Sequence, residues 1–254
     1  MAFHNSVVII TGTNRGYGVH LSETVAAKLS GDSLLILTAR NKDGLEKTKN
    51  KIEALINGNN FKVLSVMCDL SKQDKVSGFI AKCLENIDLS KFSTAMFINN
   101  AGTLGDVNIK LKDQNNANLL NGYFQFNVIN VMMLNSAFLK SFAAKKCFLI
   151  NISSLAAIQP FSTMGLYCTG KAARDMMFKV LAVENPELRV LNWSPGPMIT
   201  GMTNTMRGCC DETVATMFKN FDYVPLEVSA AKLMAILEKN EFKSGDHIDY
   251  FDEF

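Results

Sequence analysis

The strongest constraint on the fold is a regular alternation between short apolar segments and longer amphipathic ones. The apolar segments predict strands, which are Val7–Ile10, Leu34–Leu37, Lys62–Met67, Met96–Ile98, Phe148–Ile152, Arg189–Asn192 and a short last one within Gly245–Tyr250. The amphipathic segments predict helices, which are Gly16–Leu29, Asp43–Leu55, Lys72–Leu84, Asn115–Phe142 with a break near Gly122, and Tyr167–Val183. Strands that alternate with helices in this way form parallel sheets, because each crossover helix packs on a face of the sheet.

The composition is that of a globular protein. The chain has 254 residues, of which 48% are hydrophobic and 20% charged, and this excludes the disordered and collagen-like classes. The early strands are apolar throughout instead of alternating, as strands are when helices cover both faces of a sheet. No Pro-, Gly- or Ser-rich linker divides the chain. We therefore predict one α/β domain over residues 1–254, a doubly wound parallel sheet flanked by helices.

Charge and cysteine content narrow the classes of function. Lys plus Arg is 26 and Asp plus Glu is 24, so the net charge of +2 gives no support to a nucleic-acid or anionic-membrane surface. No apolar stretch has the length of a membrane span, and the polar N-terminus leaves no room for a signal peptide. The 6 cysteines form no CxxC pair and there are 3 histidines, so we expect no metal site. Reduced thiols in the cytoplasm are expected, including at Cys209–Cys210.

A glycine-rich turn follows the first predicted strand and opens the first predicted helix. It spans Thr11–Gly18, and its glycines stand at 12, 16 and 18, a spacing that differs from GxGxxG. Glycines let the backbone approach a pyrophosphate, and a helix N-terminus offers free N–H groups and a positive dipole end. The alternative is an ordinary strand-to-helix turn. The pattern predicts a Rossmann-type dinucleotide site with turn residues Gly12, Asn14, Arg15, Gly16, Tyr17 and Gly18.

The end of the second strand indicates which dinucleotide is bound. An NAD site usually places Asp or Glu there to bind the ribose hydroxyls, but this strand ends in Ala39-Arg40. A guanidinium suits a 2′-phosphate, and Arg15 in the glycine turn is a second candidate. A solvated strand end is the alternative for Arg40. The two arginines favour NADPH over NADH.

Tyr167 and Lys171 lie four residues apart at the start of a predicted helix, so they share a face. Ser154 follows the fifth predicted strand, where ligands of parallel sheets bind. A tyrosine exchanges a proton near neutral pH when a nearby cation stabilises its phenolate, and Lys171 is placed to do so. A surface Tyr/Lys pair is the alternative reading.

These motifs, in this order, resemble those of the short-chain dehydrogenase/reductase family over essentially the whole chain. The TGxxxGxG turn, Asn99–Gly102 after the fourth strand, the YxxxK motif from Tyr167 to Lys171, and Pro195-Gly196 with Thr200 carry the resemblance. It implies that Tyr167 is the catalytic acid, Lys171 its partner and a ribose ligand, and Ser154 the group that orients the carbonyl.

The resemblance also implies further site residues. Asn127 corresponds to the asparagine that holds a proton-relay water, and the remaining residues correspond to cofactor contacts: Asp69, Leu70, Asn99, Ala101, Gly102, Pro195, Gly196 and Thr200. It further implies a cofactor part at about 1–150 and a catalytic part at about 151–254. A homodimer built on the helices within 115–142 and 167–183 is also implied.

Within the family, three stretches are similar to those of a branch that reduces the side-chain carbonyl of pterins. These are Asn99–Asp106, the catalytic block Asn151–Met176, and the tail Phe242–Asp252. The resemblance implies that Asp249 anchors the pterin, since one carboxylate can accept two parallel N–H groups of a pterin ring. A solvated tail acid, or Asp252 in its place, are the alternatives.

The substrate pocket is the least determined part of the site. Leu104 belongs to a pocket segment by resemblance, and Met198, Met202 and Met206 recur at helical spacing. They either form an adaptable wall over a flat ring or belong to a lid or core. A broader NADPH-dependent carbonyl or diketone reductase therefore stays a rival, and a non-catalytic dinucleotide-binding regulator is a second one.

Overall fold

The computed structural model describes residues 3–56 and 61–254, and its centre is a seven-stranded parallel sheet. The strands are β2 (Ser6–Thr11), β4 (Leu34–Ala39), β5 (Lys62–Met67), β6 (Thr94–Asn99), β7 (Lys146–Ile152), β8 (Arg189–Ser194) and β9 (His247–Asp249). Their order is β5-β4-β2-β6-β7-β8-β9, and two further strands, β1 (Phe3–His4) and β3 (Leu29–Ser30), form a small sheet of their own. The predicted fold class is confirmed.

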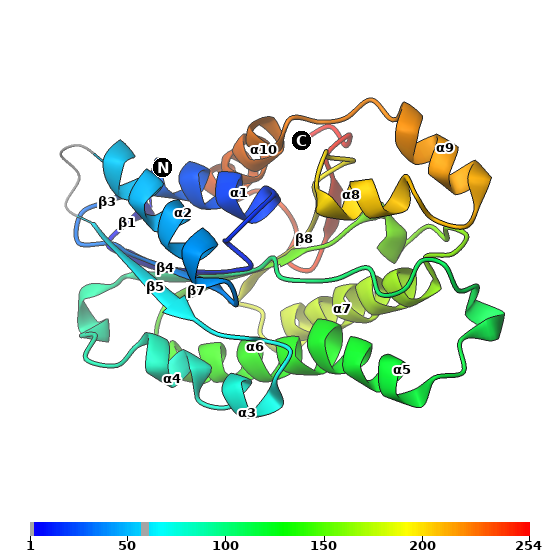
Figure 1. Ribbon diagram of the computed structural model, residues 1–254. Helices are drawn as coiled ribbons and strands as arrows, with labels where there is room; N and C mark the ends of the chain where they lie inside the picture. The colour runs from blue at the N-terminus through cyan, green and yellow to red at the C-terminus, as the bar shows by residue number, and fades with distance from the viewer. Residues whose placement is uncertain (1–2, 57–60) are drawn as a thin grey trace.

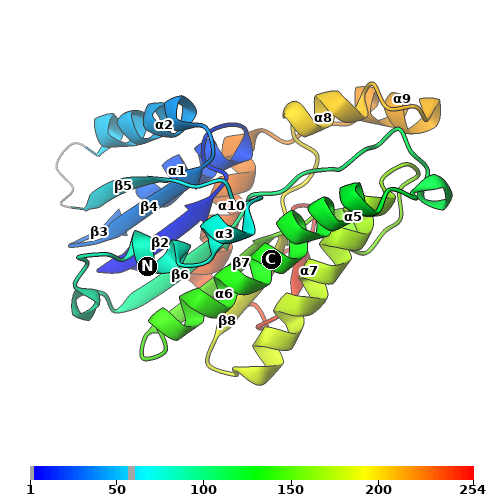
Figure 2. The same ribbon diagram turned by 60° about the horizontal axis from the view of Figure 1, so that its bottom comes forward.

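Helices cover both faces of the large sheet (Figures 1 and 2). One face carries α1 (Tyr17–Ala26), α2 (Lys42–Leu55) and α10 (Leu226–Lys239), and the other carries α4 (Phe79–Cys83), α6 (Asn130–Ser141) and α7 (Gly165–Glu184). The core follows this layering, because Val8 and Ile10 of β2 pack in one apolar cluster and Val7 and Ile9 in another. Apolar residues on both sides of the strand thus reflect burial on both faces.

The remaining helices are short or lie at the rim of the sheet. They are α3 (Gln73–Val76), α5 (Ala117–Phe124), α8 (Gly201–Met206) and α9 (Glu212–Asn220), the 3-10 turns η1 (Leu89–Lys91), η2 (Leu111–Asp113) and η4 (Leu155–Ala157), and the π-helical turn η3 (Gln125–Ile129). In Figure 2, α8 and α9 lie above the ends of α5 and α7.

Four expectations about the helices are wrong in detail. The first helix ends at Ala26, since Leu29 and Ser30 form β3. The segment expected as one helix over Lys72–Leu84 is divided at Gly78, whose φ of +79° lies in the left-handed region. The long helix has no break at Gly122, because its irregularity is η3. No helix was expected between β8 and β9, where the chain forms α8, α9 and α10.

The strands all pair in parallel, so their carboxyl ends lie at one edge of the sheet. The chain moves outward from β2 through β4 to β5 and then returns to β6 on the other side of β2. Crevices at such a reversal are the usual ligand sites of open α/β sheets.

Within the described residues, none of the helices is both long and apolar enough to cross a membrane.

Candidate functional site

The glycine turn after β2 is built by close backbone contacts. Gly12 has a φ of +73°, and its N–H donates to the carbonyl of Thr38 at 2.8 Å. A Cβ on Gly18 would stand 2.1 Å from the carbonyl oxygen of Gly12, so only glycine lets α1 begin this close to the turn. The Asn100 amide donates to the carbonyls of Thr11 and Gly12 at 2.8 and 3.1 Å, which ties the turn to the end of β6.

The turn has the features that a dinucleotide needs. No side chain caps α1 at Gly16, so the N–H groups of its first turn remain available for a phosphate. Arg15 and Arg40 are both exposed at the same edge, and β4 ends without a carboxylate. The positive charge of Arg40 also acts on Asp69 after β5, where hydrogen bonds from Ser71 lower the carboxyl pKa against the opposing effect of burial. The residues present therefore fit a nicotinamide dinucleotide.

Two predicted cofactor residues turn their side chains away from this edge. The Tyr17 hydroxyl lies in the core, where it accepts a hydrogen bond from Trp193 Nε1 at 3.1 Å and donates to Ser229 Oγ at 3.3 Å. Burial raises the pKa of Tyr17 to about 12. Leu70 is buried as well, and its carbonyl accepts from the amide of Asn130 at 2.8 Å. Of Tyr17, only the backbone groups can therefore face a nucleotide at this edge.

The loop after β8 closes the other side of the predicted nucleotide site. Gly196 has a φ of +78°, and Pro195 is buried with its carbonyl bonded to Ser229 Oγ at 2.8 Å. Thr200 caps α8 by accepting from the N–H of Thr203 at 3.4 Å. A Cβ on Gly16 would have the Thr200 side chain as its nearest neighbour, at 3.8 Å, so the loop and the glycine turn face one another.

Ser154, Tyr167 and Lys171 come together as expected. The hydroxyl groups of Ser154 and Tyr167 are hydrogen-bonded to each other, and Ser154 Oγ also accepts from the N–H of Ala156 at 3.2 Å. The ammonium of Lys171 lies 5.4 Å from the centre of the Tyr167 ring and donates to the carbonyl of Ile152 at 2.6 Å. This is the arrangement of a proton donor, a hydroxyl that can orient a carbonyl, and a cation beside both.

Burial dominates the electrostatics of this group. It raises the pKa of Tyr167, against the hydrogen bond from Ser154 and the charge of Arg174, which both lower it. It lowers the pKa of Lys171 well below its usual value, and the charge of Arg174 lowers it further while Asp175 opposes this. The pKa of Tyr167 therefore lies above the value that a tyrosine has in water, and the pKa of Lys171 lies below that of a lysine in water.

Asn127 lies in η3, the π-helical turn between α5 and α6. Its amide donates to the carbonyl of Tyr123 at 3.0 Å, and its Oδ1 accepts from the N–H of Thr103 at 2.9 Å. A Cβ on Gly102 would lie 3.4 Å from Asn127 Oδ1, so the side chain reaches the segment after β6. π-helical turns occur often at functional sites, and this one gives the asparagine its place.

A buried polar row that the sequence-based prediction missed runs beneath the site. Asn99, Asn151, Asn192 and His247 pair with one another across β6, β7, β8 and β9. The three asparagines are at most 1% exposed. Each asparagine directly follows a run of apolar residues in its strand, and that was the signal in the sequence.

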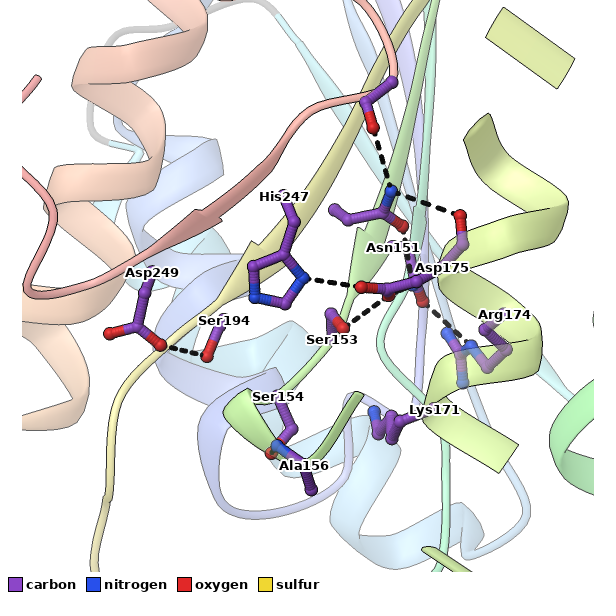
Figure 3. Close-up of polar contacts among 12 residues, drawn as sticks. Asn151, Ser153, Ser154, Ala156, Lys171, Arg174, Asp175, Ser194, His247 and Asp249 are labelled. Carbon is purple, nitrogen blue, oxygen red and sulfur yellow. Dashed lines mark hydrogen bonds and ion pairs between the residues drawn. The ribbon is translucent and has the colours of Figure 1, made fainter. Parts of the chain in front are cut away.

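Asp175 joins this row to α7 (Figure 3). Its carboxylate accepts from Asn151 Nδ2 at 3.0 Å and from Ser153 Oγ at 2.5 Å, and its other oxygen lies 2.5 Å from His247 Nδ1. The side chains of Asp175 and His247 are only 4% and 8% exposed. The strand β9 within the tail is thus attached to the helix that carries Tyr167.

Asp249 and Asp252 have different places in the tail. Register pairs Asp249 with Ser194 at the carboxyl end of β8, and the Ser194 hydroxyl donates to Asp249 Oδ2 at 2.5 Å. Asp252 instead accepts from the backbone N–H of Asp249 at 2.8 Å, so it stabilises the turn. Asp249 is the carboxylate at the edge where the other candidate residues lie. The N–H of Phe251 donates to the other carboxylate oxygen, Asp249 Oδ1, at 3.1 Å. Each of the two oxygens can still accept a further hydrogen bond.

The methionines do not form one continuous wall. Met206 is 1% exposed and packs with Leu104 and Met164 in a small apolar cluster that Tyr167 also contacts. Met202 is 37% exposed, and Met198 packs against the core cluster on the other side. Leu104 and Met206 are therefore the members of the predicted pocket that lie beside the tyrosine.

Comparison with known proteins agrees with this geometry. A model of the short chain dehydrogenase family matches residues 6–209. A sepiapterin reductase from Bos taurus is 34% identical over an alignment of 256 positions, which covers 98% of this chain and 95% of the relative. A benzil reductase from Bacillus cereus, which forms (S)-benzoin, is 28% identical over 257 residues, which cover 95% and 97%.

A solved structure, that of NAD+-bound xylitol dehydrogenase, has the same fold. Its TM-score is 0.82 at 18% identity, with 98% of this chain and 99% of that chain covered. The family resemblance of the motifs and the kinship with sepiapterin reductases are both confirmed. The chain belongs to the short-chain dehydrogenase/reductase family of oxidoreductases.

Proposed function

We propose that this oxidoreductase uses NADPH to reduce the side-chain carbonyl of 6-acyl pterins, as in the conversion of sepiapterin to dihydrobiopterin and the last reductions of tetrahydrobiopterin synthesis. The observation that carries this proposal is Asp249, a carboxylate placed by β9 at the same sheet edge as Ser154 and Tyr167. A carboxylate there suits the adjacent amino and ring N–H groups of a pterin. The sepiapterin reductases among its relatives support the same assignment.

NADPH is the proposed cofactor, and it supplies the hydride when bound. Arg15 and Arg40 would hold the 2′-phosphate, since both guanidinium groups are exposed beside the glycine turn and β4 ends without an acid. Asn99, Ala101 and the loop from Pro195 to Thr200 would line the ribose and nicotinamide side, within a cofactor part at about 1–150 and a catalytic part at about 151–254. The cytoplasm is the proposed compartment.

The catalytic roles follow from the contacts at the site. Ser154 donates a hydrogen bond that orients the carbonyl oxygen, and Tyr167 gives that oxygen its proton as the carbonyl carbon is reduced. Lys171, 5.4 Å from the ring, stabilises the phenolate left behind. Asn127 holds a water through which the proton is replaced. Ketone, NADPH and one proton thus become alcohol and NADP+.

Substrate positioning is assigned to the far end of the site. Asp249 would hold the pterin ring, while Leu104 and Met206 pack beside Tyr167 and Met202 lies at the exposed rim. Binding energy at the ring then serves to place the side-chain carbonyl at the reacting atoms.

The test is steady-state NADPH oxidation with sepiapterin for wild type, Asp249→Asn and Asp252→Asn. We expect efficient wild-type turnover and a loss of about 10- to 100-fold in kcat/KM for Asp249→Asn, the size of one charge-assisted hydrogen bond pair. Asp252→Asn should retain most activity, because its carboxylate contacts the backbone of the tail. Equal losses in the two variants would contradict the assignment of Asp249.

A diketone reductase is the second candidate function, favoured by the benzil reductases among the relatives. In that case benzil is turned over faster than sepiapterin, and Asp249→Asn leaves both rates unchanged. A non-catalytic dinucleotide-binding regulator is the third candidate. It predicts NADPH binding with no oxidation on any carbonyl compound, although the chain keeps Ser154, Tyr167 and Lys171 together.

A homodimer through α6 and α7 is part of the proposal. These helices expose apolar side chains to solvent, Met132, Met176, Val180 and Val183 among them. A groove between the two helices is lined by Met132, Asn135, Ser136, Leu139, Lys140, Met177, Leu181 and Asn185. Light scattering after gel filtration should give a dimer for wild type and a monomer for Met176→Glu. Leu55→Glu, an exposed leucine of α2, is the matched control and should stay dimeric.

A further inference from the structure

Arg174 is a buried cation that the roles assigned above do not use. It lies on α7, seven residues after Tyr167 and three after Lys171, so the three side chains share one face of the helix. That face packs on the sheet, and Arg174 is 1% exposed. A buried guanidinium is costly unless its donors are satisfied, so its contacts are informative.

The guanidinium joins α7 to the segment after β6. Its Nη2 donates to the carbonyl of Asn99 at 2.6 Å, its Nη1 to the carbonyl of Ala101 at 3.1 Å, and its Nε to Asn151 Oδ1 at 2.8 Å. Its Nη1 would also lie 3.8 Å from a Cβ on Gly102. The planar fork thus holds the catalytic helix against Asn99–Gly102, which is assigned above to the cofactor.

None of these three acceptors carries a charge, so no direct contact neutralises Arg174. Its neighbour Asp175 directs its carboxylate to Asn151, Ser153 and His247 instead. Burial lowers the pKa of Arg174 to about 10, which leaves the guanidinium protonated at neutral pH. With Lys171 protonated, two buried cations face one carboxylate, and a phenolate at Tyr167 would balance the remaining charge.

Among the described residues, five with polar or titratable side chains are neighbours of Tyr167, and Arg174 is one of them. Ser154 donates from the loop after β7, Tyr123 faces the ring from α5, and Cys168, Lys171 and Arg174 lie on α7 itself. Among these groups Arg174 is the cation that lowers the pKa of Tyr167, while Lys171 is bonded to the carbonyl of Ile152.

We propose that Arg174 is a positioning residue of the carbonyl reduction, whose buried charge stabilises the phenolate of Tyr167 while its fork fixes the cofactor segment to α7. The inference rests on the proposed reductase function for its kinetic readout only. The spacing places Arg174 two helical turns from Tyr167 on the same face, but Arg174 meets Asn99 only after β6 and β7 have paired.

The test separates the charge from the fork with two variants. Arg174→Gln keeps an amide donor and removes the charge, whereas Arg174→Lys keeps the charge and removes the fork. Arg189→Met is the matched control, since Arg189 donates to Asn240 and Phe242 at the start of β8, the end of the strand away from the site. Arg174→Met replaces Arg174→Gln where the latter does not fold, as judged by circular dichroism.

The kinetic readout is the alkaline limb of kcat in the direction of reduction, where Tyr167 must be protonated. Arg174→Gln should move this limb upward by about one pH unit and lower kcat near neutral pH about tenfold, because the phenolate loses a neighbouring cation. Arg174→Lys and Arg189→Met should keep the wild-type limb, and Arg174→Lys should weaken NADPH binding. A limb that stays in place for Arg174→Gln, or moves equally for Arg174→Lys, would overturn the proposal.

A second measurement needs no substrate. The near-ultraviolet phenolate absorbance is titrated for wild type and for Tyr167→Phe, and their difference reports Tyr167 alone. The same difference taken in the Arg174→Gln background should titrate at higher pH. An unchanged titration refutes the inference even if no carbonyl compound is turned over, whereas a shifted titration without turnover refutes only the proposed function.

Discussion

Replacing Asp175 by alanine should destabilise the protein strongly. The carboxylate is 4% exposed and accepts from three buried donors on two segments, namely Asn151 and Ser153 at the end of β7 and His247 in β9. Each orphaned donor costs about 1–3 kcal/mol, and the costs are not additive because the donors share one site. Asp175→Ala removes a buried carboxylate together with all of its hydrogen bonds, and we expect a loss of about 3–5 kcal/mol.

Asp175→Asn should cost less, about 1–3 kcal/mol, because it removes the charge that faces Lys171 and Arg174 but keeps an acceptor oxygen. Its amide oxygen still accepts from Asn151 and Ser153, and its NH2 group then faces His247 Nδ1. The imidazole accommodates this by carrying its proton on Nε2, a buried atom that has no hydrogen-bond partner among the described residues. The graded pair of variants therefore separates the loss of a charge from the loss of all acceptors.

The assay is urea unfolding followed by circular dichroism at one protein concentration, with the free energy of unfolding taken from the midpoint and slope. Asp211→Ala is the control, since this half-buried aspartate caps α9 and its loss should cost about 1 kcal/mol. The reasoning would be refuted if Asp175→Ala lost no more unfolding free energy than the control, or if Asp175→Ala and Asp175→Asn lost the same amount.

Three further predictions concern single side chains. Arg40→Ala should raise the KM for NADPH about 10- to 100-fold and leave that for NADH unchanged, as a lost phosphate contact requires, and equal changes in the two KM values would contradict this. Lys171→Met should abolish turnover and yet raise the free energy of unfolding by about 1 kcal/mol, measured by urea unfolding. Burial lowers the pKa of Lys171, so the unfolded state binds more protons, wild-type stability falls as pH falls, and the advantage of the variant should widen toward low pH. Cys210 should be alkylated first by iodoacetamide, as read by mass spectrometry, because it is exposed while burial raises the pKa of Cys83 to about 12 and of Cys147 to about 11.

Local patterns were sufficient to predict much of the fold and the centre of the site. A strand buried on both faces contains a nearly continuous apolar run, so β2, β4 and β6 are visible in the sequence. Tyr167 and Lys171 share a helix face through their spacing alone, and Ser154 follows from its place after β7. The helices α8 to α10 were not predicted, although methionines recur at helical spacing up to Met206 in α8 and Pro225 before Leu226 marks a helix start.

Other parts of the site depend on contacts between distant segments. Asn127 was expected in a helix with a break at Gly122, but its side chain is placed by η3, where it bonds to Tyr123 and to the N–H of Thr103. Asp249 and Asp252 are indistinguishable as tail acids in the sequence. Only the pairing of β8 with β9 brings Asp249 to Ser194 and leaves Asp252 to bond the backbone.

The sequence by itself determined the alternation of strands and helices, the glycine turn and the Tyr167–Lys171 pair, since each depends on residues a few positions apart. The tertiary structure decided the polar row of Asn99, Asn151, Asn192 and His247, and with it the burial of Arg174 and Asp175. The physical reason is register. Four strands from separate parts of the chain must pair at matched positions before α7 can form hydrogen bonds with polar groups of all four.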